Sequence, residues 1–159
     1  MLYCIQKGKG DKKMERTIWL DMDGTMADLY GVENWLPMLE AHNAKPYRVA
    51  KPLVRMATLA RLLNNRQRKG YRVCVISALA KNSTNAYDTA VMKAKLEWLK
   101  KHLASVRFDE IRFVPYTYTK NNANSGNDIL FDDEARRLEA WTGEAINAKN
   151  LLNGLKALA

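Results

Sequence analysis

The sequence contains little cysteine, proline or glycine: its 159 residues include two Cys, four Pro and eight Gly. Cys4 and Cys74 lie far apart and form no CxxC pair, which excludes a disulfide framework and leaves no sign of a zinc site. The composition, with 47% hydrophobic and 27% charged residues, excludes a fibrous repeat and a disordered chain. We therefore expect one globular domain over residues 1–159 in a reducing, cytoplasmic setting.

Long hydrophobic runs are also missing. No stretch approaches the ~18 apolar residues that a membrane span requires, so we expect no membrane partner. The start, MLYCIQKGKGDKK, places its apolar residues before its lysines and has no apolar run of ~7 residues. It therefore does not resemble a secretory signal.

Acidic residues are fewer than basic ones. The chain has 17 Asp and Glu against 26 Lys and Arg, a formal net charge of +9. This excess favours an anionic partner such as a nucleotide, a nucleic acid or another phosphate. A basic surface that contacts only solvent is the alternative, because net charge alone does not identify a ligand.

Short apolar runs alternate with longer amphipathic segments. The runs at 17–20, 73–76, 111–114 and 129–131 predict buried strands, with a last small strand near 145–146. Helices are predicted near 32–41, from Pro52 to a stop at Gly70, over 87–103, and in a short segment with Leu138 and Trp141 on one face. This alternation indicates an α/β fold with a parallel sheet and right-handed crossovers.

Acidic residues follow the first and fourth predicted strands. Asp21 and Asp23 come after the first, and Asp132 and Asp133 come after the fourth. Ligands of parallel sheets bind beyond the carboxyl ends of the strands, so these carboxylates can converge there. An oxygen-only cluster without His or Cys is typical of a hard cation, first of all Mg²⁺. The alternatives are turn aspartates at the first pair and a helix N-cap at FDDE.

Four segments together resemble the motifs of the haloacid dehalogenase (HAD) superfamily: DMDGT at 21–25, Ser77, Lys120 and DILFDDE at 128–134. The resemblance covers 17–146. It implies a HAD-like Rossmannoid three-layer sandwich with a central parallel sheet of about five strands. It also implies a small helical cap insert at about 26–51, between the first and second motifs.

The resemblance also implies a mechanism. Asp21 would be the nucleophile that forms an aspartyl-phosphate, and Asp23 the general acid and then the general base. Mg²⁺ would be held by Asp21, the Asp23 carbonyl and Asp133. Asp132 would either be a further ligand of the ion or contact one of its ligands. Phosphate binding would fall to Gly24, Thr25, Ser77, Ala78 and Lys120.

The lysine assignment depends on the family pattern. Lys120 fits its position in that pattern, whereas an isolated loop lysine is usually solvated. Lys95 competes for the role, but its helical setting makes it the poorer candidate. For Ser77, a hydroxyl satisfied at a strand end is the alternative. Asp23 favours phosphoryl transfer, because dehalogenases of the superfamily lack an acid at this position and transport ATPases carry Thr.

Three further segments, YGVENWL, FVPYTYTK and ILFDDEARRLEAWTGEAI, resemble the small 5'(3')-deoxyribonucleotidase branch. We therefore expect a Mg²⁺-dependent phosphatase of (deoxy)nucleoside monophosphates. Tyr30, Trp35 and Tyr47 of the insert are candidates for stacking on a base, with packing as the alternative. Phosphorylated DNA or RNA ends are an alternative substrate, and a non-catalytic module that binds phosphate or nucleic acid is an alternative function.

Overall fold

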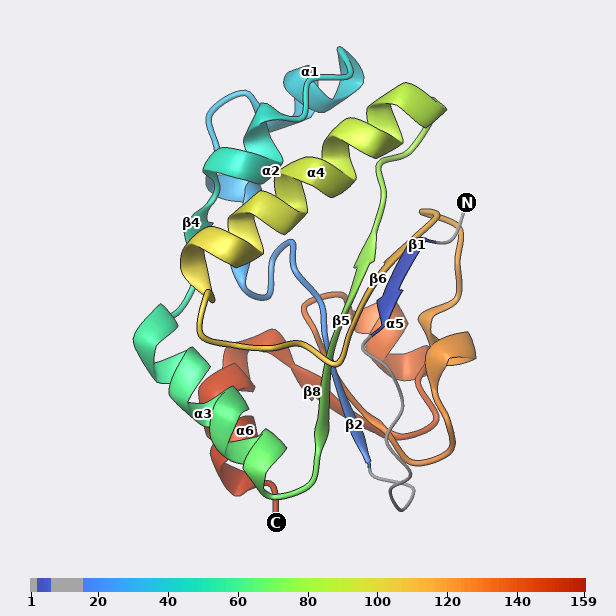
Figure 1. The fold of residues 1–159 in the computed structure, drawn as a ribbon. Helices are drawn as coiled ribbons and strands as arrows, with labels where there is room; N and C mark the ends of the chain where they lie inside the picture. Colours follow the sequence, from blue (N-terminus) through green and yellow to red (C-terminus); the bar gives the residue numbers. More distant parts are fainter. Residues whose placement is uncertain (1–2, 7–15) are drawn as a thin grey trace.

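A six-stranded sheet organises the chain (Figure 1), in a computed structural model that describes residues 3–6 and 16–159. The strand order is β1-β6-β5-β2-β7-β8. The strands are β1 Tyr3–Gln6, β2 Thr17–Leu20, β5 Arg72–Ala78, β6 Glu110–Val114, β7 Ile129–Asp132 and β8 Glu144–Asn147.

Five of these strands, from β6 to β8 in the sheet order, run parallel, which confirms the predicted α/β class. The sequence did not predict β1, which pairs antiparallel with β6 at one edge. In the centre, Leu20 of β2 pairs with Val75 of β5 on one side and with Phe131 of β7 on the other. The carboxyl ends of the first, second and fourth predicted strands therefore lie side by side.

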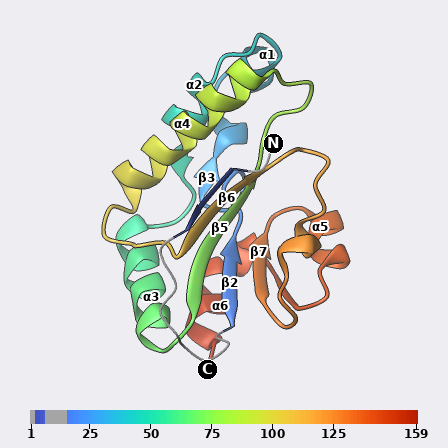
Figure 2. The ribbon, with the colours of Figure 1, turned by 45° about the vertical axis from the view of Figure 1, so that its right-hand side comes forward.

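Alternating side chains of the central strands separate the core into two layers. Ile18 and Leu20 face one layer, which α3 and α6 cover, whereas Trp19 faces the other with Cys74 and Trp141. Figure 2 shows α5 on the opposite side of the sheet from α3. The covering helices are α3 Met56–Arg68, α5 Ala135–Ala140 and α6 Leu151–Ala157. The sheet is thus flanked by helices, as predicted.

The helices differ from the prediction at several places, which include the unpredicted α2 (Lys45–Val49). Pro52 does not begin a helix: β4 (Lys51–Pro52) pairs with β3 (Ala27–Asp28), and α3 starts only at Met56. The N–H of Leu53 donates to the Met26 carbonyl at 2.9 Å, so the hairpin holds this segment extended. Trp141 lies just beyond α5 as its C-cap. Helix α6 was not predicted, because its two buried leucines make too short a pattern.

The residues between β2 and β4 form a small layer above the sheet (Figure 1). They contain β3 and the elements η1 Leu29–Gly31, α1 Trp35–Glu40 and α2 Lys45–Val49. The Trp98 indole donates to the Ala50 carbonyl at 2.8 Å, and the Tyr87 hydroxyl donates to the Asn43 carbonyl at 3.2 Å. This layer is therefore attached to the helix that carries Trp98 and Tyr87.

That helix, α4 (Asn85–His102), matches the predicted helix over 87–103. The Thr84 hydroxyl accepts from the Tyr87 N–H at 3.1 Å and caps its N-terminus. Basic residues in its last turn complement the negative end of the helix dipole. Within residues 3–6 and 16–159, no helix combines the length and the apolar character that crossing a membrane requires.

We predict that Asp128→Ala lowers the free energy of unfolding by about 2–4 kcal/mol, because buried donors lose their acceptor. The buried Asp128 carboxylate accepts from the Thr17 N–H at 3.1 Å and from the Ser125 N–H and hydroxyl at 2.9 and 2.8 Å. Urea unfolding measures the change. Glu144→Ala is the control, because the ion pair of Glu144 with Arg16 is solvent-exposed and contributes less than about 1 kcal/mol. Equal losses in both variants would contradict the prediction.

Candidate functional site

The site begins where β2 ends. The Asp21 N–H donates to the Phe131 carbonyl of β7 at 3.0 Å, which continues the pairing of the two strands by one residue. The chain then turns, because the Met22 carbonyl accepts the N–H groups of Met26 and Ala27, each at 2.9 Å. Gly24 allows this turn with a φ of +82°, a conformation that residues with a Cβ rarely adopt. Asp21 is therefore fixed at the carboxyl end of the sheet.

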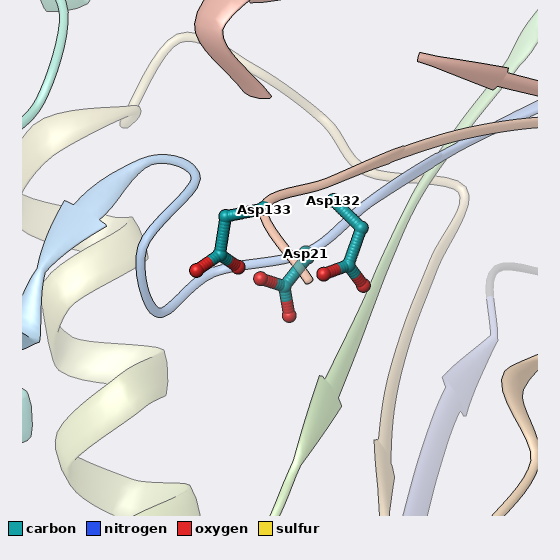
Figure 3. Close-up of side chains that lie close together, drawn as sticks. All are labelled: Asp21, Asp132 and Asp133. Carbon is teal, nitrogen blue, oxygen red and sulfur yellow. The ribbon is translucent and has the colours of Figure 1, made fainter. Parts of the chain in front are cut away.

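Three carboxylates meet at this edge (Figure 3). Asp21 follows β2, Asp132 ends β7 and Asp133 comes next in the chain. One oxygen from each lies within 4.8 Å of the others. Asp21 and Asp132 are buried, and Asp133 is partly accessible. The structure thus brings together two acidic segments that are far apart in the sequence.

Lys120 compensates part of this negative charge. Its Nζ donates to Asp21 Oδ1 at 2.8 Å and to Asp132 Oδ2 at 2.7 Å. The short helix η2 (Lys120–Ala123) places the side chain, which is buried with its two partners. The structure therefore places Lys120 in contact with Asp21 and Asp132, at the edge of the sheet where the family pattern predicts a lysine.

The carboxylates differ in their pKa values. Burial raises the pKa of Asp21, but the Lys120 ammonium outweighs this effect and the net pKa is lowered. Burial and the neighbouring Asp21 charge raise the pKa of Asp132, and the same two causes raise that of Asp133 to about 7. Burial also raises the pKa of Asp23, which the Lys95 charge only partly offsets. One member of the first acidic pair is thus held ionised and the other tends toward protonation, a pattern typical of a nucleophile and an acid.

Gly24 also makes room for Asp133. A Cβ on Gly24 would lie 2.2 Å from Asp133 Oδ2, so the carboxylate rests against the bare backbone of the turn. A residue with a Cβ at position 24 would be strained at this φ and would displace the Asp133 carboxylate. This close approach explains why the acidic pair after β7 can reach the acidic pair after β2.

The donor set fits Mg²⁺. Asp21, Asp132 and Asp133 offer only oxygen atoms, which a hard cation prefers. The Lys120 ammonium contacts two of the three carboxylates, Asp21 and Asp132, so one positive charge faces three negative ones. The raised pKa values of Asp132 and Asp133 reflect this excess of negative charge, which a divalent cation would offset.

A second buried lysine lies on the other side of the Asp23 turn. Lys95 Nζ donates to Asp23 Oδ2 at 2.8 Å, to Ser77 Oγ at 2.6 Å and to the Ala78 carbonyl at 2.8 Å. The sequence ranked Lys95 below Lys120 because Lys95 lies on a helix, but the structure places both at the site. A signal was available: position 95 falls on the buried face of α4 between Val91 and Trp98. A lysine there needs buried acceptors.

The expected phosphate-binding residues occupy the same edge. The Thr25 hydroxyl donates to Asp21 Oδ2 at 3.0 Å, so Thr25 orients the carboxylate. Ser77 is buried beneath Lys95, and Ala78 is partly accessible. Gly24 is partly accessible as well. The open side of the site is therefore lined by Gly24, Asp23, Ala78 and Asp133.

The three aromatic candidates of the insert are placed differently. Tyr30 is 52% exposed, and its ring meets that of Trp35 edge to face at 5.0 Å between centroids. Burial and the charges of Asp133 and Asp23 raise the pKa of Tyr30. Tyr47 is buried, with its ring 4.7 Å from Lys95 Nζ. Tyr30 and Trp35 can meet a ligand, whereas Tyr47 packs against the lysine.

The sequence reasoning missed Arg137. Burial lowers the pKa of Arg137, but the charges of Asp132 and Asp21 outweigh this effect and raise it. Its Nη1 lies 3.2 Å from Glu134 Oε2. No pattern in the sequence distinguishes Arg137 from its exposed neighbour Arg136.

Solved structures share this fold. The chain is similar to D,D-heptose 1,7-bisphosphate phosphatase from Burkholderia thailandensis, with a TM-score of 0.50 and 18% identity over 79% of this chain and 71% of that chain. It is also similar to a Mesorhizobium loti protein provisionally assigned as a HAD-like phosphatase. Here the TM-score is 0.57 and the identity 13%, over 98% of this chain and 91% of that chain. No protein-family model matches the sequence, and a search of curated proteins gives no match. The fold is HAD-like, as predicted.

We predict that Gly24→Ala weakens Mg²⁺ binding at least about tenfold, because the new Cβ displaces the Asp133 carboxylate. Titration calorimetry with MgCl₂ measures the affinity. Gly126→Ala is the matched control, because Gly126 also has a positive φ (+137°) but nothing lies within 4 Å of its Cβ position. Equal affinities in the two variants would show that Asp133 does not hold the ion.

Proposed function

We propose that the protein is a Mg²⁺-dependent phosphatase that hydrolyses phosphomonoesters through an aspartyl-phosphate on Asp21. One observation carries the proposal: Asp21, Asp23, Asp132 and Asp133 gather with two buried lysines at the carboxyl edge of a HAD-like sheet. Both solved structures reported above carry a phosphatase description, which supports the same chemistry.

The first chemical step is assigned to Asp21 and Asp23. An Asp21 carboxylate oxygen bonds to phosphorus while the ester P–O bond breaks, and the leaving oxygen takes a proton from Asp23. In the second step, Asp23 takes a proton from water, whose oxygen bonds to phosphorus as the bond to Asp21 breaks. The products are an alcohol and phosphate, and Asp23 is protonated again.

Other residues orient these groups and stabilise charge. Lys120 and Thr25 bond to different oxygens of Asp21, which restricts the rotation of the nucleophile. Asp21, Asp132, Asp133 and the Asp23 carbonyl would hold Mg²⁺, which supplies positive charge to the transferring phosphoryl group. The partly accessible Gly24 and Ala78 are assigned to the path by which phosphate reaches Asp21, whereas the buried Ser77 holds Lys95.

The proposed substrate is a (deoxy)nucleoside monophosphate. Tyr30 supports this choice, because its exposed ring, in edge-to-face contact with the partly buried Trp35, can stack on a nucleobase. The Burkholderia thailandensis protein is named for a heptose bisphosphate, so a substrate panel for this protein includes sugar phosphates. The buried ring of Tyr47 is assigned to packing.

A phosphorylated DNA or RNA end is a second candidate substrate. Lys81 is exposed just after β5, with Nζ 4.6 Å from the centre of the Tyr116 ring just after β6. Cationic and aromatic groups at one edge are typical of single-strand binding, and the net charge of +9 is favourable. Turnover of a 3'-phosphorylated oligonucleotide that falls steeply with salt, while that of a mononucleotide does not, would support this candidate.

We predict that EDTA abolishes phosphate release from nucleoside monophosphates and that added Mg²⁺ restores it. Asp21→Asn should lower kcat by at least about 1,000-fold, because the amide cannot attack phosphorus. A malachite green assay over a panel of mononucleotides, sugar phosphates and oligonucleotides measures both effects.

Asp88→Asn is the control for this experiment. Asp88 lies on α4, and its Oδ1 is buried without a hydrogen-bond partner in the part of the chain that the structure describes. The Asp88→Asn substitution therefore removes no observed contact of Oδ1 and should change turnover less than about twofold. Turnover that persists in EDTA, or in Asp21→Asn, would rule out the proposed mechanism. Phosphate binding without any turnover would favour a non-catalytic module.

A further inference from the structure

Lys95 is a fully buried lysine on the face of α4 that also carries Val91 and Trp98. Its side chain is 0% exposed, and Nζ donates three hydrogen bonds of 2.6 to 2.8 Å, to Ser77 Oγ, the Ala78 carbonyl and Asp23 Oδ2. An ammonium group has three hydrogens and no acceptor, so all of its bonding capacity is used within the protein. Lys95 is thus held in one position and has no donor left for a substrate.

Two of the three acceptors belong to the end of β5. The Ser77 hydroxyl and the Ala78 carbonyl fix Nζ relative to the sheet. The Tyr47 ring, 4.7 Å from Nζ, contacts the ammonium from the insert and excludes water there. The third acceptor, Asp23, lies on the turn after β2, so the lysine connects this turn to the end of β5.

The bond to Asp23 occupies one carboxylate oxygen only. Lys95 takes Oδ2, and among the residues that the structure describes no hydrogen bond reaches Oδ1. The Asp23 side chain is 17% exposed, so part of it faces the open side of the site. Lys95 therefore selects which oxygen of Asp23 is available to a substrate.

We infer that Lys95 is a positioning residue that turns Asp23 Oδ1 toward the leaving oxygen of the substrate. This inference rests on the phosphatase function proposed above. The proton moves from Asp23 Oδ1 to the ester oxygen as the P–O bond breaks, and Lys95 itself exchanges no proton and touches no substrate atom. Through Trp98 and Tyr47, the same helix contacts the insert, so the acid is positioned by the layer that lies above the site.

A leaving-group comparison tests this role. A deoxyribonucleoside 5'-monophosphate expels an alkoxide and needs an acid, whereas p-nitrophenyl phosphate expels a stable phenolate and does not. We predict that Lys95→Met lowers kcat for the nucleotide by about 30-fold and for p-nitrophenyl phosphate by less than about threefold. In an Asp23→Asn background, Lys95→Met should lower kcat for the nucleotide by less than a further factor of about two, because the acid that Lys95 positions is already absent.

Folding is checked by thermal unfolding of each variant. Methionine replaces the buried lysine with an apolar chain of similar length, and Asp23 keeps contact with solvent, so breaking the ion pair should cost less than it would for a fully buried pair. If Lys95→Met does not fold, Lys95→Gln gives the same comparison. Lys93→Met, two residues away on the exposed face of α4, is the matched control and should leave both rates unchanged.

The outcomes separate the two hypotheses. Equal losses for both esters, or losses that multiply in the Asp23→Asn background, would overturn the role of Lys95 and leave the phosphatase function intact. Failure of the unaltered protein to hydrolyse either ester with Mg²⁺ present would overturn the proposed function, and the inference with it.

Discussion

The repulsion between carboxylates at one edge of the sheet is the constraint on which the rest of the structure depends. Carboxylate oxygens of Asp21, Asp132 and Asp133 lie within 4.8 Å of one another. The Asp21 charge also contributes to the raised pKa of Asp23. Burial makes such a group unstable without cations. Two buried lysines offset part of this repulsion, and the oxygen donor set fits a divalent ion.

The two lysines divide this work. Lys120 contacts Asp21 and lowers its pKa, while Lys95 contacts Asp23, whose pKa stays raised because burial dominates there. Neighbouring aspartates in the sequence thus acquire different properties from different partners. Neither lysine belongs to the segments that carry the aspartates: Lys120 lies in η2 and Lys95 in α4. The proposed division into nucleophile and acid follows from this difference.

Much of the architecture could be predicted from the sequence, because the central parallel strands β2, β5 and β7 are short, buried apolar runs bounded by polar residues. The strand ends then place Asp21 and Asp132 at one edge, since parallel strands share their polarity. The edge strand β1 was not predicted, because four residues in a basic segment carry no periodic signal. Helix α6 was missed for the similar reason that two leucines do not define a stripe.

The site was harder to predict than the fold. The place of Lys95 depends on where α4 crosses the end of β5, and the fit of Asp133 depends on the bare backbone of Gly24. Neither relation is local in the sequence. The burial of Tyr47 likewise depends on how the insert packs, so the residue type alone did not separate it from Tyr30.

The covalent intermediate on Asp21 is the central claim, and chemical trapping tests it most directly. The protein is mixed with its best phosphomonoester and Mg²⁺, stopped in acid during turnover and reduced with borohydride, which converts an acyl phosphate of aspartate to homoserine. Peptide mass spectrometry should find homoserine at position 21 and nowhere else. Turnover with unmodified Asp21, or with the modification on Asp23, Asp132 or Asp133, would contradict the account.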